Sequence, residues 1–146
     1  MKEATVRPGR VIIADNHSST LGAICRLLEA EAETVLMVSD EASLWDALAN
    51  VNPDVVVADF SLPFANGTNV AQALKNKYPL VKVIILSLYD EKYILDEVMA
   101  TGVEGFVLKR RAAIDLIPAI HEIMQGHTYI SQDVQGSDDY ATRKYA

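Results

Sequence analysis

Five short apolar runs, separated by segments of helical periodicity, constrain this sequence more than any other feature. The third run, Val55 to Ala58, lies between Pro53 and Pro63 and contains no polar residue. A continuous apolar run of this length is typical of a strand buried on both faces, as in a parallel sheet covered by helices. The other four runs span residues 10–14, 34–38, 81–86 and 105–108. Because strands and helices alternate five times, we predict an α/β fold with parallel strands and helices on both faces.

Each apolar run is followed by a segment in which apolar residues recur at helical spacing. We therefore expect helices at residues 21–32, around 44–51, between 68 and 79, at 90–100 and at about 114–125. One of Ser18, Ser19 or Thr20 can cap the first helix, and Ser39 or Asp40 can cap the second.

Pro118 lies inside the last predicted helix. A proline is tolerated there if the helix begins near Ile114, because the amides of a first helical turn have no partner within the helix. A later start or a kink is the alternative.

The composition narrows the classes of protein that fit. Asp and Glu number 20 against 13 Lys and Arg, and this acidic balance argues against direct binding of nucleic acid by this segment. No apolar run approaches the roughly 20 residues that span a bilayer. The first eight residues are charged and polar, unlike a signal peptide. Cys25 is the only cysteine, so one chain can form neither a disulfide nor a cysteine-based metal site. We expect a cytoplasmic protein with no membrane association.

The length suits one domain. We expect an N-terminal extension at residues 1–9, a domain at 10–131, and a linker or tail at 132–146. The tail is predicted because Asp133 to Ala146 contains almost no aliphatic residue.

Polar side chains end four of the five predicted strands: Asp15 with Asn16, then Asp59, Ser87 and Lys109. In a sheet with the order 2-1-3-4-5, strands one and three are neighbours at the switch point, so Asp15 and Asp59 converge there. Clustered carboxylates suit Mg²⁺, and a lysine and a hydroxyl opposite them suit a phosphoryl group. A carboxylate is also a competent nucleophile towards phosphorus.

These residues together resemble the receiver domain of a two-component response regulator. Such domains have a flavodoxin-like (βα)5 fold, a doubly wound parallel sheet of order 2-1-3-4-5. The end of the segment resembles receivers that precede a LuxR-type helix-turn-helix output domain, which does not follow in this sequence. The matching stretches are Val11 to His17, Asp59 with Pro63 and Gly67, Ile85 to Ser87, Gly105 to Lys109, and Ala119 to Ser131.

The resemblance implies a role for each strand end. Asp59 is expected to accept a phosphoryl group from a sensor histidine kinase or a phosphotransfer protein. Mg²⁺ is expected to bind Asp15, Asn16, Asp59 and the backbone carbonyl of Ser61.

Three further residues are implied to respond to the phosphoryl group. Lys109 is expected to pair with Asp59, and Ser87 and Phe106 to act as the switch. The domain is then a switch in signal transduction, not an enzyme beyond forming and hydrolysing its own aspartyl phosphate. It would regulate transcription through an absent output domain. The helix at 90–100, the strand at 105–108 and the last helix form the expected output face, through which a homodimer can form.

Asn16 departs from the family pattern, because receivers usually carry a second acid at this position. The neutral amide removes one negative charge from the site and is expected to weaken Mg²⁺ binding. We expect His17 to be a loop residue, since imidazole is a poor partner for Mg²⁺. Two alternatives remain: a degenerate receiver-like interaction or dimerisation module that does not depend on phosphorylation, and, more distantly, a flavodoxin-like cofactor binder.

Overall fold

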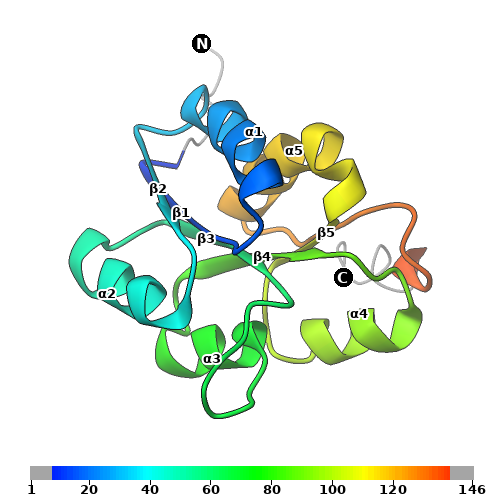
Figure 1. Cartoon of the computed structure of the whole chain (residues 1–146). Coiled ribbons are helices and arrows are strands. Elements are labelled where there is room, and N and C mark those ends of the chain that lie inside the picture. Colours follow the sequence, from blue (N-terminus) through cyan, green and yellow to red (C-terminus); the bar gives the residue numbers. More distant parts are fainter. Residues whose placement is uncertain (1–7, 139–146) are drawn as a thin grey trace.

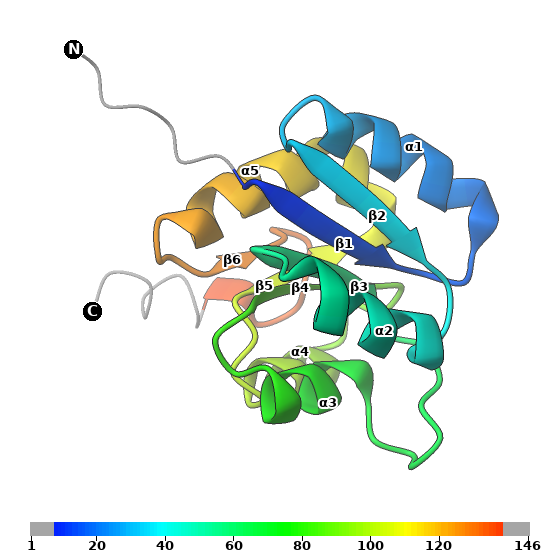
Figure 2. The same cartoon turned by 90° about the vertical axis from the view of Figure 1, so that its left-hand side faces the viewer.

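The computed structural model describes residues 8–138. One parallel sheet of six strands lies between two layers of helices, with α1 and α5 on one face and α2, α3 and α4 on the other (Figures 1 and 2). The strands are β1 (Arg10–Ala14), β2 (Thr34–Val38), β3 (Val55–Asp59), β4 (Lys82–Ser87), β5 (Gly105–Leu108) and β6 (Tyr129–Ile130). The helices are α1 (Ser18–Glu29), α2 (Glu41–Val51), α3 (Val70–Lys77), α4 (Lys92–Met99) and α5 (Ala112–Met124).

The strand order is β2-β1-β3-β4-β5-β6, which confirms the predicted doubly wound fold and its order 2-1-3-4-5. The sixth strand was not predicted from the sequence. It pairs with β5 in parallel, with Phe106 opposite Ile130. Two residues are too few to carry a recognisable periodicity, so β6 is defined by its pairing partner and not by its own pattern.

Alternate residues of the central strands enter two separate cores, as expected for a sheet that is covered on both faces. Val56 and Ala58 of β3 pack in the cluster that includes α2, α3 and α4. Val55 and Val57 pack in the cluster that includes α1 and α5. All five residues of β3 are buried, so the predicted two-sided burial of this strand is confirmed.

α1 begins at Ser18, three residues before the predicted start, and its N-cap is His17. The prediction that Ser18, Ser19 or Thr20 caps this helix is therefore wrong. The physical reason is a tight turn at the end of β1: the His17 backbone N–H donates to Asp15 Oδ1 at 2.8 Å, and such an aspartate turn leads the chain directly into the helix. At α2 the open choice resolves to Asp40, whose side chain accepts the Ser43 backbone N–H at 2.8 Å.

α5 begins at Ala112, so Pro118 is its seventh residue and lies beyond the first turn. The helix therefore starts before Ile114, and neither a first-turn proline nor a later start applies. A proline here removes the N–H that would bond to the carbonyl of Ile114. Pro118 and Ile114 are both exposed, so water can hydrate that carbonyl and the helix continues to Met124.

The chain stays packed beyond Ser131, where the predicted tail begins. Val134 is buried in the core cluster that includes α4. The Gln135 backbone N–H donates to the carbonyl of Asp90 at 2.9 Å, just before α4. Residues 139–146 of the predicted tail and residues 1–7 of the predicted N-terminal extension lie outside the described residues.

Candidate functional site

Two buried aspartates meet at the carboxyl edge of the sheet. Ala14 of β1 is in register with Ala58 of β3, so the residues that follow them, Asp15 and Asp59, lie side by side. Their exposed fractions are only 0% and 1%. Buried carboxylates without compensating charge are costly, so a cation is required between them.

Lys109 provides one such cation from the end of β5. Its Nζ lies 3.2 Å from Asp15 Oδ2 and 3.2 Å from Asp59 Oδ2, and its side chain is mostly buried. One ammonium group against two carboxylates leaves a formal charge of minus one. The convergence of Asp15, Asp59 and Lys109 that the sequence predicts is therefore present in the structure.

Ser61 follows β3 and holds the Asp59 carboxylate from the loop side. Its backbone N–H donates to Asp59 Oδ1 at 3.2 Å, and its hydroxyl donates to Oδ2 at 3.0 Å. These bonds fix the carboxylate in a defined orientation. They also bring the backbone of Ser61, the predicted carbonyl ligand, to the edge of the cluster.

His17 lies in this cluster as well, although the sequence predicts only a loop residue there. Its Nδ1 is 3.1 Å from Asp59 Oδ2, 3.2 Å from Asp15 Oδ1 and 3.0 Å from Lys109 Nζ. The signal in the sequence is its position two residues after Asp15, where the aspartate turn folds the chain back towards the strand end. Asn16, by contrast, is exposed, and within residues 8–138 no hydrogen bond or ion pair joins its side chain to the cluster.

The donor atoms fit a divalent cation. Asp15, His17 and Asp59 each offer one ligand atom, and these atoms lie within 4.8 Å of one another. Asp15 Oδ2 is buried and accepts no hydrogen bond from the described residues; the Lys109 ammonium group, 3.2 Å away, is its charged neighbour. A buried oxygen with an unused lone pair is suited to a metal ion.

Ser87 ends β4 and Phe106 lies within β5. The Ser87 hydroxyl donates to the carbonyl of Tyr89 at 2.9 Å and accepts the Tyr89 backbone N–H at 2.9 Å. Phe106 is fully buried in the core. In this structure Ser87 therefore fixes the start of the loop between β4 and α4, and Phe106 packs in the core.

A second polar network, which was not predicted, fastens β6 to α5. Asp115 accepts hydrogen bonds from Arg111 Nε at 2.9 Å, Tyr129 Oη at 3.0 Å and Ser131 Oγ at 2.6 Å. Burial alone would raise the pKa of Asp115, but the bonds from Arg111, Ser131 and Tyr129 together lower it. Burial and the bond to Asp115 raise the pKa of Tyr129 to about 12. The i, i+4 spacing of Arg111 and Asp115 is the only local sign of this network in the sequence.

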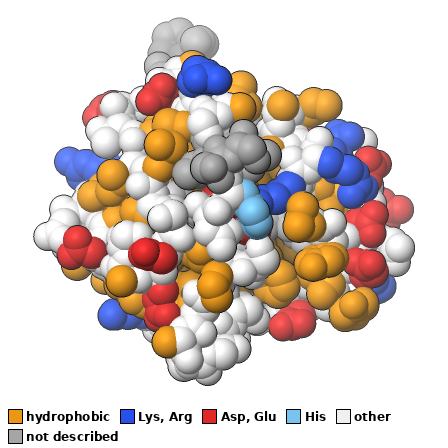
Figure 3. Space-filling view, in the orientation of Figure 1, with side chains coloured by type: hydrophobic (Ala, Val, Ile, Leu, Met, Phe, Trp, Pro, Cys, Tyr) orange, Lys and Arg blue, Asp and Glu red, His pale blue; other side chains and the backbone are white. Residues whose placement is uncertain are grey.

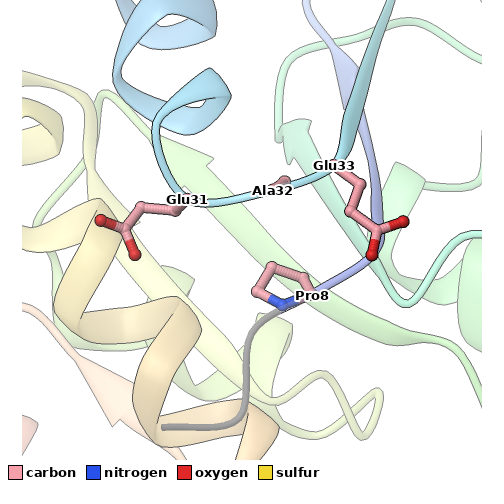
Figure 4. A pocket seen from close by; sticks show the side chains of 4 residues that line it. All are labelled: Pro8, Glu31, Ala32 and Glu33. Carbon is pink, nitrogen blue, oxygen red and sulfur yellow. The ribbon is translucent and has the colours of Figure 1, made fainter.

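The surface has two further features, a hollow and a group of exposed hydrophobic side chains. A hollow at the amino end of the sheet is lined by Pro8, Glu31, Ala32 and Glu33, and contains no residue of the cluster (Figure 4). Hydrophobic side chains gather on the side of the molecule where α4 lies (Figure 3). The exposed large hydrophobic residues in this stretch of the chain are Leu88 and Tyr89, in the loop before α4, and Tyr93 in α4. Among the described residues, no helix has the length and apolar character to cross a membrane.

Comparisons with known proteins point to a single family. Residues 11–121 match the family described as the response regulator receiver domain. The transcriptional regulatory protein DegU of Brevibacillus brevis is 33% identical over 127 residues, covering 86% of this chain and 54% of that protein. Across three curated relatives, the share of their own length that the chain spans is 54%, 60% and 65%.

Solved structures agree with the sequence match. The non-phosphorylated receiver domain of the stress response regulator RcsB from Escherichia coli superposes with a TM-score of 0.78 at 27% identity, covering 85% of this chain and 98% of that one. RcsB from Salmonella typhimurium, described in connection with DNA interaction, gives a TM-score of 0.80 at 27% identity, covering 88% of this chain and 66% of that one.

Proposed function

This chain belongs to the response regulator receiver domain family, and from that premise we propose that it is a signalling switch set by phosphorylation of Asp59. The observation that carries the proposal is the meeting of Asp59, Asp15 and Lys109, with Lys109 Nζ 3.2 Å from a carboxylate oxygen of each aspartate. An oxygen nucleophile, an acidic cation site and a basic group for the phosphoryl oxygens are the parts that phosphoryl transfer requires.

Asp59 is the proposed nucleophile. A carboxylate oxygen forms a bond to phosphorus while the bond between phosphorus and the nitrogen of a phosphohistidine breaks. The product is an acyl phosphate on Asp59, and the donor imidazole takes up a proton from water. Ser61 supports this step because its N–H and hydroxyl hold the carboxylate in place. The proposed donor is a sensor histidine kinase or a phosphotransfer protein.

Asp15 and Asp59 would hold Mg²⁺, with the Ser61 backbone carbonyl and the side-chain oxygen of Asn16 as further ligands. When bound, the ion draws charge from the phosphoryl oxygens. The buried Asp15 Oδ2, which accepts no hydrogen bond from the described residues, supports this assignment. No external substrate is turned over; the only chemistry proposed is formation and hydrolysis of the aspartyl phosphate.

Lys109 and Ser87 are the proposed partners of the phosphoryl oxygens. Lys109 already contacts Asp59, so a small rotation of its side chain is sufficient for a new ion pair. Ser87 must give up its two bonds to Tyr89 before its hydroxyl can turn towards Asp59. Phe106, which is already fully buried in the core, would pack behind it. Such a local change in charge and hydrogen bonding can bias an element with two arrangements.

The proposed output is control of transcription. DegU, of which this chain spans 54%, is named a transcriptional regulatory protein, and this name supports the proposed output. The acidic balance of this segment argues against direct contact with DNA by the segment itself. The α4-β5-α5 face is the proposed surface for a partner or a second copy. Its exposed residues Leu88, Tyr89 and Tyr93 support that role.

The function is tested by intact mass measurement after treatment with acetyl phosphate and Mg²⁺. We expect one phosphoryl group per chain, which hydroxylamine removes. Asp59→Asn should carry none, because an amide is not a nucleophile towards phosphorus. Asp46→Asn, an exposed position on α2, is the matched control and should be modified like the native chain. An adduct of equal yield on Asp59→Asn would show that Asp59 is not the acceptor.

Asn16 favours one second candidate, a receiver-like interaction module that works without phosphate. The family's usual second acid is absent, so the cation site is less charged. Absence of any adduct on the native chain, together with an oligomeric state that acetyl phosphate does not change, would favour this module.

A further inference from the structure

We propose that His17 adds a nitrogen ligand to the cluster of Asp15, Asp59 and Lys109. Compared with a site made of oxygen ligands only, the cluster then has a stronger preference for a late first-row divalent metal, such as Co²⁺ or Zn²⁺, over Mg²⁺. The proposal deepens the proposed function, because it concerns the metal at the same pocket. The ligands are Asp15, His17 Nδ1 and Asp59, whose donor atoms lie within 4.8 Å of one another.

The backbone turn brings His17 to the cluster, and the contacts of its ring hold the imidazole there. The His17 N–H bonds to Asp15 Oδ1 at 2.8 Å, and His17 is the N-cap residue of α1. The turn places the Cα of His17 next to the cluster, and in the observed rotamer Nδ1 lies 3.1 Å from Asp59 Oδ2 and 3.2 Å from Asp15 Oδ1. The side chain is 49% exposed, so an ion can approach from solvent.

The chemistry of the donors decides which ion is preferred. Mg²⁺ binds oxygen ligands and keeps much of its water, whereas imidazole is a good ligand for Zn²⁺ and its neighbours in the first row. Two carboxylates and one imidazole make three protein ligands, and zinc sites with three protein ligands keep a further position open. A water or a phosphoryl oxygen can take that position.

Asn16 shifts the balance in the same direction. An aspartate there would add a charged oxygen near the pocket, which strengthens binding of a hard ion such as Mg²⁺ most. With asparagine, two carboxylates and the Lys109 ammonium group leave a formal charge of minus one. Lys109 Nζ, 3.0 Å from His17 Nδ1, has to withdraw when any metal binds. That cost applies to every ion, so it cancels in the ratio of two affinities.

The test is calorimetric titration of the full chain with Co²⁺ and with Mg²⁺, without any phosphodonor. The quantity measured is the ratio of the two affinities, because most sites bind Co²⁺ more tightly than Mg²⁺ in any case. We expect His17→Ala to lower this ratio at least tenfold, with less than a twofold change for Mg²⁺. The visible absorption of bound Co²⁺ should change as well, since a nitrogen ligand is lost.

His127→Ala is the matched control. His127 is an exposed histidine that is far from His17 in the sequence, and its Nδ1 lies 2.8 Å from Glu122 Oε1. It should leave the ratio unchanged. His17→Asn serves as a second variant if His17→Ala does not fold, and the same loss of ratio is expected. An unchanged ratio in the His17 variants, or an equal loss in His127→Ala, would overturn the proposal.

Failure here can be told apart from failure of the proposed function. If the ratio is unchanged while Asp59 still takes up a phosphoryl group, His17 is not a ligand and the switch stands. If the ratio falls as expected while Asp59 takes up no phosphoryl group, the metal site stands and the switch does not.

Discussion

Asn16 follows Asp15 directly after the end of β1, and it is exposed. Replacing it by aspartate would add one negative charge beside a divalent ion at nearly constant shape. Near a protein surface, a pair of unit charges at about 4 Å interacts by roughly 4 kcal/mol before the cost of desolvation. We expect Asn16→Asp to tighten Mg²⁺ binding about tenfold, which corresponds to about 1.4 kcal/mol. Titration followed by Trp45 fluorescence or calorimetry measures it.

The control is Asn50→Asp, on the exposed side of α2, which should not change Mg²⁺ affinity. Equal affinities in the native chain and Asn16→Asp would mean that position 16 is not near the bound ion. The interaction module would then lose its main support.

At the same scale, the positions of Asp15, Asp59 and Lys109 could be predicted, because each directly follows a strand and parallel strands end at one edge. The position of the His17 ring could not. The turn that brings His17 to the cluster depends on a hydrogen bond between the His17 backbone and the Asp15 side chain, and the ring contacts depend on its rotamer as well. A pattern of residue types reveals neither.

Among the elements, the strands follow the apolar runs closely because burial on both faces leaves little choice of residue. The helix ends and β6 were less predictable. β6 depends on Asp115 of α5 and on Ser131, whose hydroxyl also accepts the Leu108 backbone N–H at 3.1 Å. These bonds join residues far apart in the sequence, so no local signal indicates them.

This network gives a pH dependence of stability. The pKa of Tyr129 rises from 10.0 to about 12 on folding. The protonated Tyr129 hydroxyl therefore contributes its full stabilisation below pH 10, and this stabilisation is lost as the pH rises from 10 towards 12. Two pKa units correspond to at most about 2.7 kcal/mol, and partial exposure of the ring reduces this to roughly 1–2 kcal/mol.

Urea unfolding of the native chain and Tyr129→Phe at pH 8 and pH 11 isolates this contribution. The difference in unfolding free energy between the two proteins should shrink at pH 11. A constant difference would contradict the bond between the Tyr129 hydroxyl and Asp115.

The lowered pKa of Asp115 affects stability at acid pH. The stabilisation by the Asp115 carboxylate is present above about pH 4 and is lost as the pH falls below 3.8.

Across the whole molecule, Ser87 connects the pocket to the end of the described chain. Its hydroxyl makes both of its bonds to the backbone of Tyr89. The next residue, Asp90, accepts the Gln135 N–H at 2.9 Å and lies 3.3 Å from Arg110. A movement of Ser87 towards a phosphoryl group on Asp59 would therefore release a loop that holds residues 132–138.

We expect hydrogen exchange to detect this release. Each lost hydrogen bond contributes about 0.5–1.5 kcal/mol, so losing two lowers the free energy of opening the loop by roughly 1–3 kcal/mol. With a phosphoryl mimic on Asp59, amides of residues 88–95 and 134–137 should exchange faster, by about one to two orders of magnitude. α2 has no contact with Ser87 among the hydrogen bonds described above, and its amides serve as the internal control.

Ser87→Ala should show the faster exchange even without the mimic, since the hydroxyl is gone. If residues 88–95 keep the same protection in both cases, Ser87 does not hold this loop and the signal leaves the pocket by another route.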